Sequence, residues 1–454
     1  MKICMIHFIA AVGLSVGVGA ASGQSLSEDF KLVASDGEEF DHFGRSISID
    51  NGIVVVGADF DDGFGTGSGS VYLFEASTGT QLEKLIPKDG QAGDHFGYSV
   101  DVHSGIVAIG ARLNDERASD AGAAYLFDGS TGMQLFKFVA SDGGSGDWFG
   151  GSIAIDNGVV AVGATRDDDR GLQSGSVYLF DATTGAELFK LTASDGGAGD
   201  AFGHSIGIHN GIVVVGAYGN DHDGGNSAGA AYLFDVSTGA QLMKLTAEDG
   251  QEGDQFGISV EIDNEIVAVG ASGDDDFGSR SGSAYLFDAS TGEELFKLNA
   301  SDGGNSDLFG RTIAIDSGIV AVGSVWDDNM ALNSGSVYIF DSSTGEELAR
   351  LAASDGEFDS MFGSTLGIEN RFVFVGAPLQ STFGSLSGSA YVFDVGCRVD
   401  LNNDFALNFY DVSAFFGLFV DGDLAVDFID DGSLNFGDVS IFIAEFGQGC
   451  PLVQ

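Results

Sequence analysis

The stretch FGRSISIDNGIVVVGADFDDGFGTGSGSVYLF, residues 43–74, contains the pattern that decides the fold. It opens on a Phe-Gly pair that recurs along the chain of 454 residues. The seven copies begin at Phe43, Phe96, Phe149, Phe202, Phe256, Phe309 and Phe362, at steps of 53, 53, 53, 54, 53 and 53 residues. So regular a period indicates a repeat protein in which each copy is one supersecondary unit.

The first unit predicts four short β-strands, at residues 43–50, 53–58, 69–74 and 81–85. The first strand alternates in polarity, whereas the second, IVVVGA, is a continuous apolar run typical of a strand covered on both faces. Between them, Asn51-Gly52 suits a type I′ hairpin because both residues tolerate positive φ. Four antiparallel strands in each of seven units are typical of propeller blades.

The two ends of the repeat region distinguish a closed ring from a linear stack. The last unit stops after a third strand at residues 389–393, and an unmatched fourth strand, FKLVASDG at residues 30–37, precedes the first Phe-Gly. Adding this strand to the last blade closes the ring and removes two exposed sheet edges. We therefore expect a mainly β, seven-bladed β-propeller over residues 24–395, with the N-terminal strand closing the last blade.

These units resemble FG-GAP repeats, the blades of the integrin-α head and of many bacterial extracellular proteins. Phe362-Gly363 and Gly376-Ala377-Pro378 of the seventh unit are literal instances of the pattern, and the resemblance covers residues 28–395. It implies an extracellular binding or adhesion protein. Integrin-type blades often have a calcium loop between their first two strands. Here that connection is a short turn, so this calcium site is not expected.

The composition and the N-terminus predict an exported acidic protein. The 68 acidic and 18 basic residues give a formal net charge of -50, which repels nucleic acid and anionic membrane surfaces. Residues 1–23 combine Lys2 with an apolar stretch that ends in small residues, the pattern of a secretory signal. We expect the mature chain to be secreted or held at a cell surface, with no membrane span.

Residues that recur in every unit are expected to build the scaffold. A tyrosine occupies the position of Tyr72 in all seven units, and we expect these rings to pack between blades. Acidic residues recur at the positions of Asp36, Asp41 and Asp62, in the two long loops of the unit. They either accept backbone N–H bonds that fix these loops or form one cation site in each blade.

Residues that vary between units on that same face are candidates for function, because loops on a rigid scaffold carry binding residues. The candidate ligand-binding residues are Arg45, Phe60, Arg112, Arg166, His204, Tyr218, Arg311 and Trp326. Aromatic residues and arginine are enriched in binding hot spots. The alternative is that these are loop residues without a role. The sequence contains no HExxH motif, and no catalytic residue is assigned.

The composition changes at Gly396-Cys397, and residues 396–454 predict a small helical module with two calcium loops. The loops begin 27 residues apart and place oxygen ligands at the spacing of EF-hand loops. The expected ligands are Asp400, Asn402, Asp404, Ala406 (carbonyl), Asn408 and Asp411 in the first loop, and Asp427, Asp431, Ser433 (carbonyl), Asn435 and Asp438 in the second. Short amphipathic helices are expected from Val412 and Val439.

This pair of loops resembles a dockerin, and its flanking Gly-Cys pairs resemble the bacterial GC-type dockerin-like anchor. The resemblance implies calcium as the cofactor and a cohesin-like or cell-surface protein as the partner. Phe405 replaces the glycine of loop position 6 and Ile429 replaces a side-chain oxygen, so we expect a reduced calcium affinity. Two cysteines in an exported chain favour a disulfide between Cys397 and Cys450 over two free thiols.

Three functions fit these features. The first is a non-catalytic extracellular binding or display protein, whose loop face binds a ligand and whose tail docks to a partner. The second is a secreted polysaccharide-active enzyme, which requires two carboxylates facing one another in a pocket. The third is a purely structural surface-layer protein. We expect the first, because no catalytic set of residues emerges from the sequence.

Overall fold

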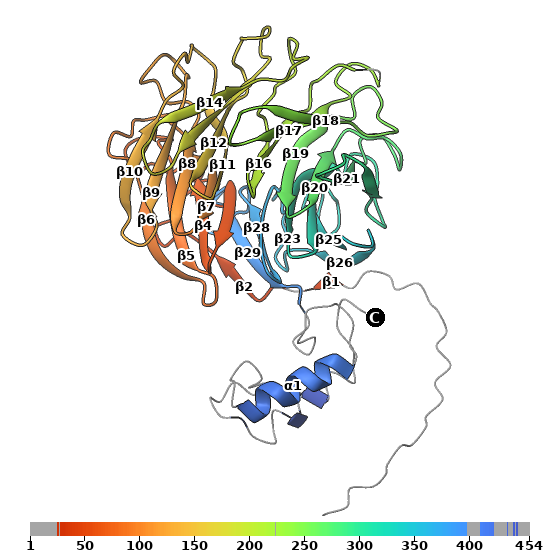
Figure 1. Cartoon of the computed structure of the whole chain (residues 1–454). Coiled ribbons are helices and arrows are strands. Elements are labelled where there is room, and N and C mark those ends of the chain that lie inside the picture. Colours follow the sequence, from red (N-terminus) through yellow and green to blue (C-terminus); the bar gives the residue numbers. More distant parts are fainter. Residues whose placement is uncertain are drawn as a thin grey trace, which may run out of the picture.

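The structure is a computed structural model that describes residues 25–26, 28–222, 224–396, 409–421, 434, 439–440 and 442–443. Seven sheets follow one another along the chain and are arranged in a ring (Figure 1). The mainly β, seven-bladed propeller predicted from the repeat is therefore confirmed. The expected signal segment, residues 1–23, lies outside the described residues.

Each blade pairs its strands in order from an inner first strand to an outer fourth strand. The first strands are β3 (Ser46–Asp50), β7 (Phe96–His103), β11 (Phe149–Asp156), β15 (Ile206–His209), β19 (Phe256–Asp263), β23 (Phe309–Asp316) and β27 (Thr365–Glu369). The second strands are β4 (Ile53–Ala58), β8 (Ile106–Ala111), β12 (Val159–Ala164), β16 (Ile212–Ala217), β20 (Ile266–Ala271), β24 (Ile319–Ser324) and β28 (Phe372–Ala377). First strands of neighbouring blades contact one another around the whole ring, including β27 with β3.

The outer half of each blade consists of a buried third strand and a partly exposed fourth strand. The third strands are β5 (Ser70–Glu75), β9 (Ala123–Asp128), β13 (Ser176–Asp181), β17 (Ala230–Asp235), β21 (Ser283–Asp288), β25 (Ser336–Asp341) and β29 (Ser389–Asp394). The fourth strands are β6 (Thr80–Leu85), β10 (Met133–Phe138), β14 (Glu187–Leu191), β18 (Gln241–Leu245), β22 (Glu294–Leu298), β26 (Glu347–Leu351) and, in the seventh blade, β2 (Phe30–Leu32).

The N-terminal strand closes the ring as the sequence predicted. Strand β2 pairs antiparallel with β29, with Phe30 opposite Val392 and Leu32 opposite Ala390. The structure adds a second contact that the sequence did not predict. Strand β1 (Ser25–Leu26) pairs in parallel with β26, on the outer edge of the sixth blade. Its two residues have no counterpart in the repeat, so no internal comparison could identify them.

The first strands differ from the unbroken strand expected after each Phe-Gly. In β7, Phe96 pairs with Ala111 but Ser99 pairs with Gly110, so two residues form a bulge between them. Gly97 in this bulge has a φ of 88°, and a Cβ atom there would lie 2.7 Å from the Ser70 carbonyl oxygen. The bulge therefore requires the glycine of the Phe-Gly pair. The Asn51-Gly52 turn has φ values of 50° and 73°, which agrees with the expected type I′ hairpin.

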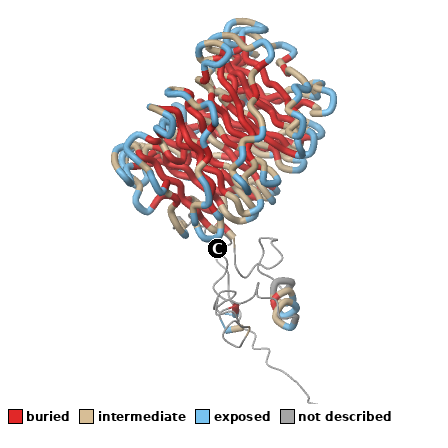
Figure 2. Tube along the Cα trace, turned by 90° about the vertical axis from the view of Figure 1, so that its left-hand side faces the viewer, coloured by how far each residue is buried: buried red, intermediate tan, exposed pale blue. Residues whose placement is uncertain are grey.

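The hydrophobic core lies between blades. Seven clusters of buried side chains each join two neighbouring blades; one combines Val55 and Leu73 of the first blade with Phe96 and Tyr125 of the second. Phe96 meets Tyr125 edge-on, with ring centroids 5.4 Å apart. The recurring tyrosines are fully buried, which confirms the prediction that they pack between blades. Figure 2 shows the buried strands in red and the exposed loops at the edges.

A recurring serine joins each blade to the next at the level of the Phe-Gly bulge. Ser46 Oγ donates a hydrogen bond of 2.8 Å to the carbonyl oxygen of Gly97 in the second blade. Equivalent bonds run from Ser99 to Gly150 and from Ser152 to Gly203. This buried contact fixes the position of one inner strand against its neighbour.

Part of the C-terminal region is helical. Helix α1 (Phe409–Asp421) covers the segment where the first tail helix was expected, and residues 439–440 and 442–443 are helical at the second. The rings of Phe415 and Phe442 stack with centroids 4.0 Å apart, so the two segments pack together. Among the described residues, no helix combines the length and apolar character needed to span a membrane.

Candidate functional site

The recurring carboxylates of the long loops fix the backbone of those loops. Asp41 Oδ2 accepts a hydrogen bond of 2.6 Å from the Glu38 N–H, and Asp62 Oδ1 accepts one of 2.8 Å from the Gly67 N–H. The same bonds recur at equivalent acidic residues, including Asp147 and Asp168 in the third blade. Of the two interpretations drawn from the sequence, this geometry supports loop fixation over one cation site in each blade.

A partly buried network accounts for the recurring Asp36 position. The Tyr72 hydroxyl oxygen lies 2.9 Å from Asp36 Oδ1 and 2.8 Å from Asp61 Oδ2, so its one proton faces two carboxylate acceptors. Lys84 Nζ donates to the same two carboxylates. The sequence reasoning missed Asp61, because it precedes Asp62 and the two cannot be told apart by composition. The signal was present in the polar residues that occupy the Asp61 position in every unit: Asn114, Asp167, Asn220, Asp274, Asp327 and Gln380.

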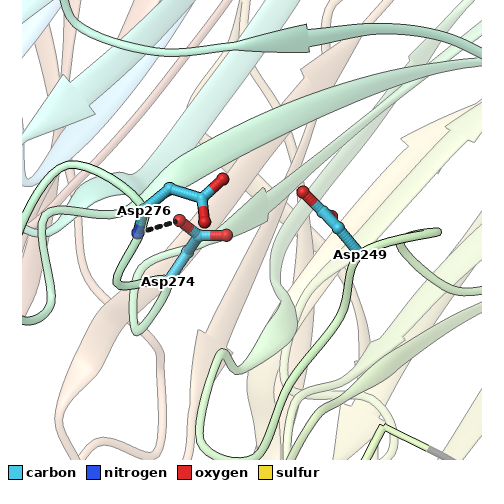
Figure 3. Close-up of side chains that lie close together, drawn as sticks. All are labelled: Asp249, Asp274 and Asp276. Carbon is cyan, nitrogen blue, oxygen red and sulfur yellow. Dashed lines mark hydrogen bonds between the residues drawn. The ribbon is translucent and has the colours of Figure 1, made fainter.

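The fifth blade brings three carboxylates close enough to suggest a metal site. Asp249, Asp274 and Asp276 place one oxygen each within 4.8 Å of one another (Figure 3). Lys297 Nζ already contacts all three carboxylates, at 2.6, 3.1 and 2.5 Å respectively. A lysine ammonium group therefore provides the positive charge at this point, which argues against a divalent ion in the same place.

The axis of the propeller contains two cavities, both lined by all seven inner strands. The larger has a volume of about 660 Å³ and lies at the end that carries the long loops. The smaller, of about 370 Å³, lies at the end that carries the two-residue turns. The two share the apolar side chains of Ile47, Val100, Ile153, Ile206 and Leu366, which mark the boundary between them.

The larger cavity collects most of the candidate ligand-binding residues. It is lined by Arg45, Phe60, Arg112, His204, Arg311 and Trp326. Of the two remaining candidates, Tyr218 meets the lining residue His204 edge-on, with centroids 4.7 Å apart. Arg166 lies one contact further out, on Trp148, which in turn contacts the lining residue Arg112. We call this cavity the arginine mouth, after Arg45, Arg112 and Arg311. The structure thus brings residues from different blades to one place.

Arginines and aromatic rings alternate around one side of the arginine mouth. The guanidinium carbons of Arg45 and Arg112 lie 4.3 and 3.6 Å from the ring centre of Tyr98. Those of Arg112 and Arg166 lie 4.8 and 3.3 Å from that of Trp148. In each of these contacts, the electron-rich face of the aromatic ring attracts the positively charged guanidinium group and restricts its position.

The sequence reasoning did not select Tyr98 or Trp148 as candidates. Tyr98 follows a Phe-Gly pair, at the variable position already occupied by Arg45 and Arg311. Trp148 precedes the phenylalanine of the next pair, at a position that also varies between units, although His42 and His95 share one residue type. Tyr98 lay at a position that the comparison of units had already covered, and Trp148 would have been found if the comparison had been extended by one position.

His42 and His95, which have no partner apparent from the sequence, share one carboxylate in the structure. His95 Nδ1 lies 3.2 Å from Asp59 Oδ2, and His42 Nδ1 lies 3.9 Å from Asp59 Oδ1. Phe60 packs between the two imidazole rings, with centroids 4.6 and 4.3 Å away. Asp59 is the only carboxylate among the described residues that line the arginine mouth, and the two histidines lie against it.

The interior of the arginine mouth is positively charged. Burial, followed by the charge of Arg45, lowers the pKa of Arg311. Burial, followed by the charges of Arg311 and Arg45, lowers the pKa of His204 to about 3. His204 is therefore a neutral imidazole at pH 7, while the arginines keep their charge because a guanidinium cannot be deprotonated in a protein.

The smaller cavity has the opposite character, and we call it the acidic mouth. Its lining includes Asp101 and Glu261, together with Asp156 and Asp263 at the ends of inner strands. Burial raises the pKa of Asp101 to about 6 and that of Glu261 to about 8. Asp101 accepts hydrogen bonds from Ser48 Oγ at 2.6 Å and from the Ile155 N–H at 2.7 Å. The axis therefore runs from a cationic end to an anionic end.

The predicted calcium ligands of the tail fall outside this description. Asp411 lies in helix α1, and the structure describes its backbone only. The other ligands lie outside the described residues: Asp400, Asn402, Asp404, Ala406, Asn408, Asp427, Asp431, Ser433, Asn435 and Asp438. Cys397 and Cys450 also lie outside them. The calcium loops and the disulfide remain predictions.

Comparison with known proteins identifies the repeat. A family model described as FG-GAP repeat matches residues 26–74, 80–127, 133–180, 186–234, 240–287, 293–340 and 346–393. Each match runs from a fourth strand into the third strand of the next blade, so the first match contains β2. A search of curated proteins finds no match. A crystal structure of the computationally designed Ika8 protein matches with a TM-score of 0.46 and 18% identity, over 80% of this chain and 99% of that chain. So remote a likeness supports no statement about function.

Proposed function

The chain belongs to the FG-GAP repeat family, and from this premise we propose that it is a non-catalytic extracellular binding protein whose ligand enters the arginine mouth. FG-GAP repeats are typical of extracellular proteins. The observation that supports the proposal is the distribution of its residues. Recurring residues build the scaffold, whereas residues that differ between blades converge on one cavity of about 660 Å³, a volume in the range of small-molecule sites.

The proposal is tested by filling the cavity. Ser364 lines the arginine mouth at a position where other blades carry Arg45, Tyr98, His204 and Arg311, so the scaffold accepts a large side chain there. Ser364→Tyr should obstruct the cavity without unfolding the blade. A matched control is Leu135→Tyr on the outer strand β10, where Leu135 is exposed.

The measurement is a thermal-shift screen of the mature chain against neutral sugars, sugar acids, amino acids and short peptides, followed by calorimetry of each compound that stabilises the protein. The wild type and Leu135→Tyr should bind at least one compound, and Ser364→Tyr should lose it. A ligand that binds Ser364→Tyr as tightly as the wild type contradicts a site at the arginine mouth. The absence of any ligand for the wild type counts against a binding function.

The tail is proposed as the docking module. Its two loops carry oxygen ligands at EF-hand spacing, and helix α1 packs against the second helical segment through Phe415 and Phe442. We propose that calcium orders these loops and that the tail then binds a cohesin-like or cell-surface partner. The disulfide between Cys397 and Cys450 would link the two ends of the module.

Calcium titration of the full mature chain tests this part. The wild type should release or absorb heat on calcium binding, and Asp400→Ala combined with Asp427→Ala should abolish that heat. A chain that ends at residue 395 serves as the control, since it retains every blade. A heat that persists without the tail assigns calcium to the propeller instead, and the absence of heat in the wild type rejects calcium binding.

The acidic mouth supports a second candidate function. A glycoside hydrolase uses one carboxylic acid with a raised pKa beside a second carboxyl group. Asp101 and Glu261 line the same cavity, and burial raises the pKa of both. The enzyme alternative requires hydrolysis of a polysaccharide by the wild type and its loss in Glu261→Gln. A panel of polysaccharides left intact by the wild type would remove this candidate.

A further inference from the structure

The described lysines and arginines divide into eight that form an ion pair and eight that form none; of the second group, Lys88, Arg117, Arg170 and Arg280 are exposed, and the other four lie at or beside the arginine mouth. Seven of the eight cations with an ion pair occupy equivalent outer positions: Lys31, Lys84, Lys137, Lys190, Lys244, Lys297 and Arg350. Within the described part of the chain, Arg45, Arg112, Arg166 and Arg311 form no ion pair. A chain with 68 acidic and 18 basic residues could easily have paired them. Four cations without partners therefore lie at or beside one cavity.

Partial burial makes the free charges of Arg45, Arg112 and Arg311 costly, whereas Arg166 is exposed to water. A charge removed from water without a counter-ion raises the free energy of the folded state. The Nε atom of Arg112 is buried and has no hydrogen-bond partner. Burial is the largest cause of the lowered pKa values of Arg311 and His204, and neighbouring arginine charges lower them further. Among the described residues, no group accepts a hydrogen bond from Arg112 Nε.

The stacking geometry leaves the arginines able to receive an acceptor. The guanidinium carbons lie over the ring faces of Tyr98 and Trp148, and an aromatic ring supplies no oxygen acceptor, so these contacts leave the arginines without an anionic partner. A planar guanidinium edge matches the two oxygens of a carboxylate or sulfate group. The cations are thus held in place for an oxyanion before one is bound.

From these observations we propose that the arginine mouth binds a small acidic ligand through carboxylate or sulfate groups contacted by Arg45, Arg112 and Arg311. This inference rests on the proposed function and specifies its ligand class. The cavity of about 660 Å³ has room for a ligand of disaccharide size, which could present one acidic group to each side of the mouth.

The net charge of -50 does not prevent such binding. At physiological ionic strength, exposed charges are screened over about 8 Å, so the arginines within the cavity dominate the local field. Asp59 is the only carboxylate among the described residues of the lining, and it faces His42 and His95. The remaining axial carboxylates lie in the acidic mouth, beyond the apolar boundary that includes Ile47 and Leu366. An anion is therefore expected to enter only from the long-loop end.

The test uses the full mature chain and two probes that differ in charge alone. Digalacturonate carries two carboxylates, and its dimethyl ester is neutral with a similar shape; inorganic sulfate is the minimal probe. Arg45→Gln and Arg311→Gln each remove one proposed contact. Arg280→Gln is the matched control, because Arg280 is an exposed loop residue and the third blade carries Gln173 at the equivalent position.

Calorimetry at physiological ionic strength should show that the wild type and Arg280→Gln bind sulfate and digalacturonate but not the ester. Each arginine variant at the mouth should lose about 10-fold or more in affinity. The affinity of the wild type should also fall as salt is added. Equal binding of the ester, or unchanged binding in both mouth variants, overturns the proposal, as does a wild type that binds neither anion.

The outcomes separate this inference from the proposed function. A neutral ligand that binds the wild type, is lost in Ser364→Tyr and is retained in the arginine variants would reject the acidic ligand and keep the binding site. Anion binding that survives in Ser364→Tyr but is lost in Arg280→Gln would place the anion on the outer loops and reject both.

Discussion

Lys31 and Asp355 form an ion pair across 324 residues of chain, with Nζ 2.8 Å from Oδ2. Lys31 also lies over the ring of Tyr391, at 5.0 Å from its centre. In the first blade, Lys84, Asp36 and Tyr72 form the same arrangement. The N-terminal strand therefore supplies the seventh blade with the side-chain network of the others, as well as the hydrogen bonds of a fourth strand.

Closure of the ring by β2 predicts that Leu32 contributes as much to stability as a leucine within a blade. Leu32 and Leu85 are both almost fully buried at equivalent positions, whereas Leu82 is half exposed. Leu32→Ala and Leu85→Ala should each lower the free energy of unfolding by about 2–4 kcal/mol, and Leu82→Ala by much less. Urea denaturation measures all three variants. If Leu32→Ala behaved like Leu82→Ala, the N-terminal strand would not be part of the folded ring.

Removal of Lys297 should expose the repulsion among its three acidic partners. Asp274 is buried, while Asp249 and Asp276 are nearly half exposed, so Lys297→Ala should cost only about 1–2 kcal/mol at pH 7. Although burial alone would raise it, hydrogen bonds from Lys297 and Tyr285 lower the pKa of Asp249.

A lowered pKa means that this stabilisation is present above the ordinary value of 3.8 and is lost as the pH falls below it. The difference between Lys297→Ala and the wild type should therefore shrink in acid. Lys88→Ala, which removes an exposed lysine, should change the stability at neither pH. A Lys297→Ala variant as stable as the wild type at pH 7 would show that the network is dispensable.

The sequence predicted the blades well and the side-chain network poorly, for a physical reason. Strand positions follow from alternation and apolar runs, and the closing strand followed from FKLVASDG, which matches FKLNASDG at residues 296–303 in the fifth step of the repeat. Asp61 is buried and its neighbour Asp62 is exposed, and this difference depends on the backbone conformation of the loop. Strand β1 was missed because Ser25–Leu26 joins the outer edge of a finished blade, where no pattern requires a partner.

Glu261 should make the stability of the propeller decrease with rising pH. Burial raises its pKa to about 8, from an ordinary value of 4.5. Between these values the unfolded chain has lost the proton while the folded chain retains it, so stability falls as the pH rises from 4.5 to about 8. Glu261→Gln should remove this dependence on pH and raise the free energy of unfolding by about 2 kcal/mol at pH 8. This value is smaller than the full pKa shift would give, because the Glu261 side chain lines the acidic mouth.

Denaturation at pH 4 and pH 8 checks this prediction. Glu293→Gln, which alters an exposed glutamate in an outer turn, is the control and should leave the pH dependence unchanged. The contrary result is a wild type whose stability rises between pH 5 and pH 8 and a Glu261→Gln variant that follows the same curve. That result would show that Glu261 ionises freely in the acidic mouth.

His204 should report on the charge of the arginine mouth. Because burial and then the charges of Arg311 and Arg45 lower its pKa to about 3, its imidazole should stay neutral at pH 5. Arg311→Gln should raise that pKa, since it removes one of the two charges, and a bound anion should raise it as well. NMR titration of the histidine ring signals measures these shifts. An ordinary pKa near 6.5 for His204 would mean that the mouth is open to water and carries no excess charge.

The candidate site was predictable in part. Comparison of the units selected Arg45, Arg112 and Arg311 because they occupy positions whose residue differs between units, whereas scaffold positions keep one residue type. It could not show that no carboxylate pairs with them, because pairing depends on which loops approach each other across the ring. Asp59, three positions before the recurring acidic residue Asp62, turns to His42 and His95 instead.

Anomalous diffraction from crystals soaked in a few millimolar selenate tests the central claim most directly, because selenium locates the oxyanion itself. The account predicts an anomalous peak within hydrogen-bonding distance of Arg45, Arg112 or Arg311 in the wild type, and its loss in the Arg45→Gln, Arg311→Gln double variant. Selenate found only at exposed loop arginines such as Arg117 and Arg170, with none in the arginine mouth, would contradict it.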